Sequence, residues 1–293
     1  MYVVTGATGN TGRVIANRLL AAGKNVRVVS RRADHLNAFV GRGAEPFVAD
    51  VTDQFALAKR FNGAEAVYAM IPPNATCEDF RAEQRRVSEA IAGALEQAGV
   101  KYAVALSSVG ADKKAGTGPV VGLHEFEETL NRIAGLNVVH LRAGYFMENT
   151  LGQPAAIRAM GKMPGPLRGD LKLPFIATQD IGNAAGDLLL KLDFSGKQTR
   201  ELRGQRDLSY DEAAEIIGKA IGKPDLKYVQ FPGEQIKPLF ITFGMSTSMA
   251  DLILEMSEAL NSGHMKALEP RSSQNTTPTS FETFVAEHLA PIQ

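Results

Sequence analysis

Short apolar runs alternate with amphipathic stretches through the first half of the chain. Several of the runs carry no polar position, which is typical of strands that are covered on both faces. We expect strands at 3–5, 26–30, 46–49, 66–71, 103–107 and 137–142, and helices near 10–22, 53–62, 78–98 and 122–134. This alternation predicts an α/β fold: a Rossmann-type, doubly wound parallel sheet with helices on both faces.

After Ala143 the alternation breaks, and residues 148–173 are rich in Gly, Pro and Met. Ser209 and Glu212 form an S-x-x-E capping box that predicts the start of a helix ending near Gly222. Further helices are expected near 179–192, 246–260 and 279–288, and strands at 199–203 and 227–231. We therefore expect residues 1–147 to form a Rossmann domain to which 176–198 return, and 148–175 with 199–293 to form a smaller α/β C-terminal domain.

Three glycines lie where the first strand turns into the first helix, in the sequence MYVVTGATGNTG. Gly6 permits a tight turn, Gly9 removes a Cβ from the path of a diphosphate, and Gly12 allows the helix to pack closely on the sheet. A glycine-rich structural turn is the alternative. We expect this loop to bind a dinucleotide through Gly6, Thr8, Gly9, Asn10, Thr11 and Gly12.

The end of the second strand reads Ser30-Arg31-Arg32, with no acidic residue before Asp34. An NAD site usually places a carboxylate here for the ribose hydroxyls, whereas guanidinium groups suit the 2′-phosphate of NADP. Arg31 and Arg32 therefore predict NADP, with NADPH preferred over NADH. The alternative is a pair of solvated surface charges.

Other candidate cofactor contacts follow the later strands, at the edge where open parallel sheets bind ligands. Asp50 also fits an ordinary turn, and Tyr145 and Phe146 also fit an aromatic core. The candidates are Asp50, Ile71, Pro72, Ser107, Tyr145 and Phe146. A soft apolar group near the end of the chain fits either core packing or a pocket for planar molecules: Phe240, Phe243, Met245, Met249 and Met256.

Composition narrows the remaining classes. The 293 residues include 32 basic and 32 acidic side chains, so the formal net charge of zero predicts neither nucleic-acid nor anionic-membrane binding. No apolar run reaches the roughly 18 residues of a membrane span. The single Cys77 and five scattered histidines predict no metal site. One cysteine cannot form an intramolecular disulfide, which fits a reducing cytoplasm. The glycine loop begins almost at Met1, so we expect no secretion signal before it.

The chain resembles the NmrA-like group of atypical short-chain dehydrogenases. The resemblance rests on TGATGNTG, the arginine after the second strand, and the segments 107–111, 141–149 and 275–281. It implies an NADP-binding Rossmann domain and a smaller domain, with a cleft over the nicotinamide. The group includes quinone, azo-dye and triphenylmethane-dye reductases, and also redox-sensing regulators.

Active short-chain dehydrogenases commonly use Y-x-x-x-K, which places Tyr and Lys on one helix face for proton transfer. None of the six tyrosines here has a lysine four residues later. The nearest analogue in the helix after the fifth strand is His124, with Glu128 one turn on. His124 is therefore the candidate proton donor, and a solvated His/Glu pair is the alternative.

These features favour an NADPH-dependent reductase that passes hydride directly, without flavin, to a quinone-like, azo or other conjugated acceptor. The expected substrate is small, planar and hydrophobic. The main alternative is a non-catalytic NADP(H) redox sensor that acts through a protein partner, and homodimer formation stays open. A reductase or isomerase of phenolics is a third reading; there the helix after the fifth strand usually supplies a lysine, whereas Lys113 and Lys114 lie before that helix.

Overall fold

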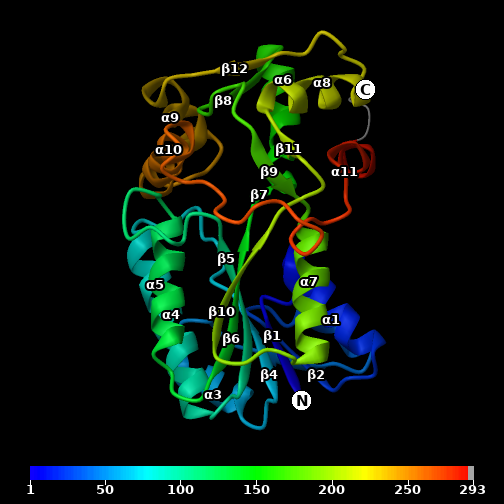
Figure 1. Cartoon of the computed structure of the whole chain (residues 1–293), viewed down its shortest axis with the longest axis vertical. Helices are drawn as coiled ribbons and strands as arrows, with labels where there is room; N and C mark the ends of the chain where they lie inside the picture. The colour runs from blue at the N-terminus through cyan, green and yellow to red at the C-terminus, as the bar shows by residue number, and fades with distance from the viewer. Residues whose placement is uncertain (290–293) are drawn as a thin grey trace.

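A seven-stranded parallel sheet forms the centre of the protein. The structure is a computed structural model that describes residues 1–289. The strands of the sheet are β1 (Tyr2–Thr5), β2 (Val26–Ser30), β3 (Glu45–Val48), β4 (Ala66–Ala69), β5 (Tyr102–Ser108), β6 (Asn137–Ala143) and β10 (Lys197–Leu202). They pair in the order β10-β6-β5-β4-β1-β2-β3, and every neighbouring pair is parallel (Figure 1). The expected Rossmann-type α/β fold is confirmed.

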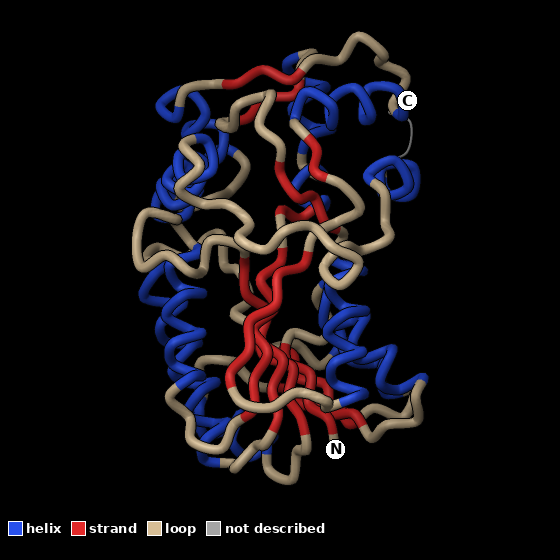
Figure 2. Tube along the Cα trace, in the orientation of Figure 1, coloured by secondary structure: helices blue, strands red, loops and turns tan. Residues whose placement is uncertain are grey.

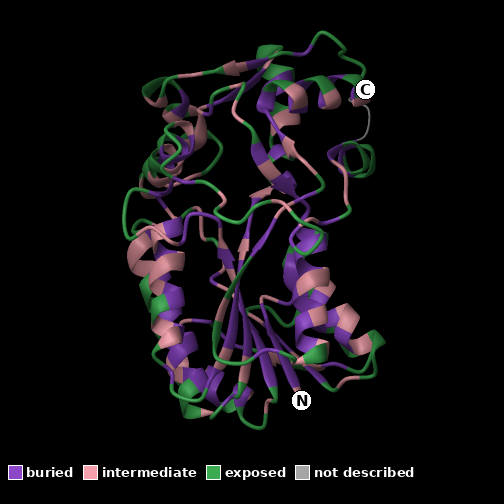
Figure 3. Cartoon of the chain, viewed as in Figure 1, coloured by how far each residue is buried: buried purple, intermediate pink, exposed green. Residues whose placement is uncertain are grey.

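Helices cover both faces of this sheet, as Figure 1 shows. One face carries α1 (Asn10–Ala21) and α7 (Thr178–Lys191), and the other carries α3 (Gln54–Phe61), α4 (Phe80–Gln97) and α5 (Val120–Asn131). A short 3-10 turn, η1 (Asp34–Leu36), and helix α2 (Asn37–Val40) connect β2 to β3. Strands β1 and β4 are buried at every position between the two layers (Figure 3), which explains their almost wholly apolar sequences, whereas the edge strands β3 and β10 carry exposed positions.

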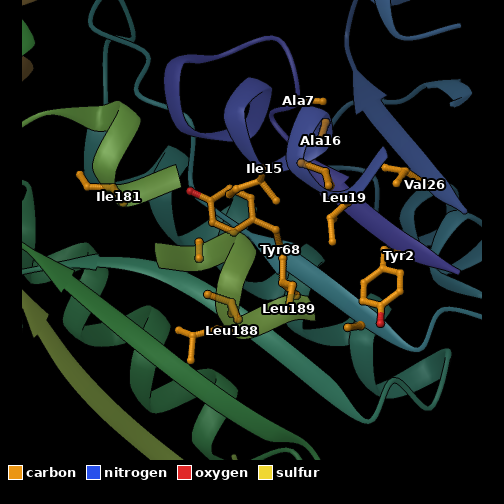
Figure 4. Packing of buried hydrophobic residues seen from close by; sticks show 14 of the residues in the cluster. Tyr2, Ala7, Ile15, Ala16, Leu19, Val26, Tyr68, Ile181, Leu188 and Leu189 are labelled. Atoms are coloured by element: carbon orange, nitrogen blue, oxygen red, sulfur yellow. The ribbon is translucent and has the colours of Figure 1, made fainter. Parts of the chain in front are cut away.

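Each face of the sheet has its own hydrophobic core. On the α1 side, Tyr68 of β4 belongs to a buried cluster with Ile15 of α1 and Leu189 of α7 (Figure 4). On the other side, Val67 packs in a cluster with Phe61 and with Ile91 of α4. Successive residues of β4 thus supply opposite cores, because side chains alternate across a strand.

The remaining elements lie beyond the carboxyl ends of the large sheet (Figure 2). Two small sheets pair in the orders β11-β9-β7 and β12-β8. Their strands are β7 (Tyr145–Phe146), β8 (Met163–Gly165), β9 (Leu173–Ile176), β11 (Asp207–Leu208) and β12 (Tyr228–Gln230). The helices around them are η2 (Met147–Thr150), α6 (Gln153–Met160), α8 (Tyr210–Ala220), α9 (Gly233–Thr242), α10 (Thr247–Asn261) and α11 (Phe281–His288). A third core, which includes Phe175, Tyr210 and Phe281, holds this region together.

The second half of the chain departs from expectation in several places, among them the short strands β7, β8, β9 and β11, which were not predicted. Strand β10 pairs with β6 in the large sheet, so part of the range 199–293 lies there rather than in the smaller region. Helices α6 and α9 were not predicted. Glycine and proline are common around α6, and Pro238 interrupts the helical pattern of apolar residues in α9. The helix after Ser209 is confirmed, and both hydrogen bonds of its capping box are formed. No helix in the described part of the chain is long and apolar enough to cross a bilayer.

Candidate functional site

The loop between β1 and α1 needs glycine at two of its positions for backbone reasons. Gly6 has a φ of +61°, and the Gly9 N–H donates to the Gly6 carbonyl at 2.9 Å. A Cβ added at Gly12 would lie 2.2 Å from that same carbonyl oxygen. Only glycine therefore lets α1 pack this closely against the loop.

Helix α1 presents the N–H groups of its first turn without a side-chain cap. Gly9 occupies the N-cap position, no side-chain hydrogen bond is formed there, and no acidic residue lies in the first turn. Thr8 and Asn10 are exposed beside these groups. Unpaired N–H groups at the positive end of a helix dipole attract anions, so the geometry fits a nucleotide diphosphate.

The side chain of Thr11 faces the core instead of the loop's open side. Thr11 is buried, and its hydroxyl shares a hydrogen bond of 2.8 Å with the Tyr68 hydroxyl. Tyr68 is itself fully buried, and this burial raises the pKa of its hydroxyl. Thr11 can therefore serve a cofactor only through its backbone, and its hydroxyl anchors the start of α1 to β4.

The two arginines after β2 differ in their surroundings. Arg32 donates to Asp34 from Nε at 3.2 Å and from Nη2 at 2.7 Å, and both side chains are exposed. This hydrogen bonding lowers the pKa of Asp34 and raises the pKa of Arg32. Arg31 forms no hydrogen bond or ion pair within residues 1–289, so its guanidinium is available to a ligand.

Further basic residues, which the sequence did not single out, lie beside the glycine loop. Arg13 of α1, His35 and Arg42 line one surface hollow of about 420 Å³ with Thr8. Arg13 could have been noticed in the sequence, because it lies one helical turn after Gly9. In the structure its backbone N–H donates to the Gly9 carbonyl. The hollow adds positive charge close to the arginines that follow β2.

Asp50 is held in a local turn. Its Oδ1 accepts hydrogen bonds from the Thr52 N–H at 2.9 Å and the Thr52 hydroxyl at 2.8 Å. The backbone hydrogen bond from Thr52 lowers the pKa of Asp50, and the charge of Arg31 contributes a smaller lowering. These contacts agree with the turn interpretation of Asp50, with Arg31 near enough to interact with its charge.

A predominantly apolar cavity of about 270 Å³ lies beyond the carboxyl ends of β4, β5 and β6. Residues of α4, α5 and α10 close its sides, and Figure 1 shows α10 above α5 at this end of the sheet. Its polar lining side chains are Gln84, Ser107, Ser108, Tyr145 and Asn149. None of the lining residues is an Asp, Glu, Lys, Arg or His. The cavity therefore suits an uncharged, mainly apolar molecule.

Most of the residues expected at this edge of the sheet reach the cavity. Ile71, Ser107, Tyr145 and Phe146 line it, as do Met249 and Met256 from the soft apolar group. Pro72 does not line it, whereas the following Pro73 does. The rest of the soft apolar group, Phe240, Phe243 and Met245, lies outside the cavity, and Phe243 is 55% exposed.

His124 lies on a different side of α5 from the residues that line this cavity. Val120 and Leu123 of the same helix line it, and one further residue turns the helix by about 100°. The His124 Nδ1 is instead hydrogen-bonded to the Ala111 carbonyl at 2.9 Å. With Glu128 it borders a separate polar hollow between α4 and α5. His124 therefore does not line this cavity, and its role as proton donor stays a prediction.

Glu127 lies on α5 one turn after Leu123, faces the sheet and is buried. Its carboxylate accepts the Ser107 hydroxyl at 2.5 Å and two hydrogen bonds from Arg142, at 2.9 and 2.6 Å. Ser107 and Arg142 are register partners on β5 and β6. This network was not predicted, although Arg142 is a charged residue in a strand that is mostly buried.

Comparison with known proteins gives a match over nearly the whole chain. The family model described as "NmrA-like family" matches residues 2–285. An NAD(P)H azoreductase of Xenophilus azovorans is 28% identical over 258 residues, which cover 87% of this chain and 86% of the azoreductase.

Two solved structures share the fold. An NADPH-dependent quinone oxidoreductase from Escherichia coli, complexed with NADPH, aligns with a TM-score of 0.84 and 22% identity over 99% of both chains. A Citrobacter sp. triphenylmethane reductase complexed with NADP(H) aligns with a TM-score of 0.82 and 17% identity, over 98% of this chain and 100% of the reductase.

Proposed function

This chain belongs to the NmrA-like family, and from that membership we propose that it is an NADPH-dependent reductase of neutral, conjugated acceptors such as quinones. The observation that carries the proposal is the uncharged, apolar cavity at the carboxyl edge of the sheet. The names of the azoreductase, the quinone oxidoreductase and the triphenylmethane reductase support the same reaction class.

NADPH would supply the hydride and bind along the carboxyl edge of the large sheet. The glycine loop and the first turn of α1 would hold its diphosphate. Arg31 would pair with the 2′-phosphate and Arg13 would add positive charge, whereas Arg32 would first have to leave Asp34. Ile71, Ser107, Tyr145 and Phe146 would surround the nicotinamide end, where they line the cavity.

The acceptor would occupy the rest of this cavity. A quinone takes hydride onto an electron-poor conjugated system, so a Tyr/Lys pair is not required to start the reaction. The apolar walls would exclude water and hold the flat acceptor against the hydride donor, and this positioning supplies much of the rate enhancement. Four methionines, Met70, Met249, Met256 and Met265, give the walls an adaptable surface.

The test is NADPH oxidation by the purified protein with three kinds of acceptor: a neutral quinone, a neutral azo dye and a sulfonated azo dye. We expect turnover of the neutral acceptors and none of the sulfonated dye, because no cationic side chain lines the cavity. NADPH binding without oxidation by any acceptor would overturn the proposal. That result would favour the redox-sensor alternative, for which binding to a protein partner should differ between NADP⁺ and NADPH.

A further inference from the structure

We infer that the Tyr145 hydroxyl is the hydrogen-bond donor to the acceptor in the cavity, and that Tyr210 positions it. The inference rests on the proposed function and adds a residue role to it. A quinone that gains a hydride carries negative charge on oxygen until water supplies the proton that completes the hydroquinone. A donor aimed at that oxygen stabilises the developing charge.

Of the other polar lining residues, Asn149 hydrogen-bonds to Tyr145 itself, and the remaining three use hydrogen-bonding groups within the protein. The Ser107 hydroxyl donates to Glu127, and the Ser108 hydroxyl donates to the Val109 carbonyl at 2.9 Å. Gln84 is buried, donates to the Pro119 carbonyl and accepts from Arg81, both at 2.9 Å. Both serine protons are thus already used.

Tyr145 has the opposite arrangement. Its oxygen accepts a hydrogen bond from the Tyr210 hydroxyl at 2.9 Å, which leaves its own proton for another partner. Tyr210 is buried and does not line the cavity, so its hydroxyl acts on Tyr145 alone. Such a chain of hydroxyls strengthens the outer donor, because each hydrogen bond polarises the next.

The surroundings keep this hydroxyl protonated and in place. Burial raises the pKa of Tyr145, and hydrogen bonds from Tyr210 and Asn149 offset part of the rise. The ring packs against Phe175, with centroids 5.3 Å apart, and edge-on to Tyr210 at 6.0 Å. Tyr145 is therefore a fixed, neutral donor at neutral pH, and the proton consumed in the reaction comes from water.

The experiment compares two ligands of the same shape in the NADP⁺ complex, where no hydride can be transferred. Duroquinone has two carbonyl oxygens, durene is its hydrocarbon counterpart, and the methylated quinone ring does not alkylate Cys77. We expect Tyr145→Phe to weaken duroquinone binding about 5- to 10-fold and to leave durene binding unchanged. Tyr210→Phe should weaken duroquinone binding about 2- to 5-fold, because the Tyr145 hydroxyl remains but loses its support.

Tyr228→Phe is the matched control. Tyr228 belongs to the same aromatic cluster, with its ring 4.8 Å from that of Tyr210, but its hydroxyl donates to the Leu167 carbonyl away from the cavity. It should leave the binding of both ligands unchanged. Equal losses for duroquinone and durene in Tyr145→Phe, or no loss for either, would overturn the inference.

Turnover gives the second readout. With NADPH, Tyr145→Phe should lower kcat for duroquinone about 10- to 100-fold. If the wild-type protein reduces no acceptor, the proposed function fails, and the binding comparison still decides the role of Tyr145. If the wild type is active and Tyr145→Phe matches it, the inference about Tyr145 fails alone.

Discussion

Ser107 of β5 donates its hydroxyl proton to the buried carboxylate of Glu127 on α5, across 2.5 Å. Arg142 neutralises this carboxylate with two hydrogen bonds. Because Ser107 has only one proton, it faces the cavity as a hydrogen-bond acceptor. In the reductase proposed above, Ser107 would accept from a ligand and leave the donor role to Tyr145.

The Glu127 and Arg142 pair leads to a prediction about stability. Glu127→Gln leaves a largely buried guanidinium without its counter-charge, and breaking a buried pair in this way costs about 3–5 kcal/mol of the free energy of unfolding. Urea denaturation measures the change. The exposed neighbour in Glu128→Gln is the control and should change stability by less than about 0.5 kcal/mol. Equal effects of the two substitutions would show that Glu127 is not the buried partner described here.

The arginines after β2 should differ in their effect on cofactor choice. Arg31→Ala should weaken NADPH binding about 10-fold or more and leave NADH binding nearly unchanged, because only NADPH carries the 2′-phosphate. Arg32→Ala should have a smaller effect, since Arg32 is already paired with Asp34. Fluorescence titrations with both nucleotides check this, and equal losses of NADPH and NADH affinity would contradict it.

Gly12→Ala should disturb the loop between β1 and α1. The added Cβ would meet the Gly6 carbonyl oxygen at 2.2 Å, so the loop and the first turn of α1 must separate. We expect a drop of more than about 10-fold in NADPH affinity and a lower Tm. Gly152→Ala is the control, because a Cβ there meets no atom within 4 Å and the backbone φ of −78° is ordinary. An unchanged NADPH affinity in Gly12→Ala would remove the loop from the cofactor site.

The sequence was sufficient for the first six strands of the large sheet and for the glycine loop, because both depend on local signals, but it did not place β10 in that sheet. Apolar runs of strand length identify buried parallel strands, and glycine at a strand-to-helix turn has a local backbone cause at Gly6. The resemblance to the NmrA-like group is likewise confirmed by the family model.

The sequence does not show which side chains of α5 face the sheet and the cavity. A shift of one residue along a helix rotates a side chain by about 100°. Leu123 lines the cavity and Glu127, one turn later, faces the sheet, whereas the expected His124 follows Leu123 by one residue and points elsewhere. The partners of Glu127 come from two other elements, so only the tertiary structure shows its role. The same holds for Tyr145 and Tyr210, which are 65 residues apart in the chain.

His140 should make the protein sensitive to mild acid. It is 1% exposed on β6, with Nε2 hydrogen-bonded to the Asn131 side-chain oxygen at 2.9 Å. Burial lowers its pKa from 6.5 to about 4, although the nearby charge of Glu127 opposes the shift. An unfolded histidine takes up a proton near pH 6.5, so the unfolded state binds more protons between about pH 6.5 and pH 4. The free energy of unfolding should therefore fall as the pH drops through this window.

His140→Gln isolates this contribution, because glutamine does not titrate and can still donate to Asn131. A pKa difference of about 2.5 units corresponds to about 3 kcal/mol. Between about pH 7 and pH 4, the free energy of unfolding of the variant should therefore fall by up to about 3 kcal/mol less than that of the wild type. Urea denaturation at several pH values measures both curves, and subtracting them cancels the contribution of the carboxylates. His35→Gln is the control substitution, because the side chain of His35 is 47% exposed and no buried imidazole is removed. Parallel curves for wild type and His140→Gln would show that the imidazole of His140 is not buried in its neutral form.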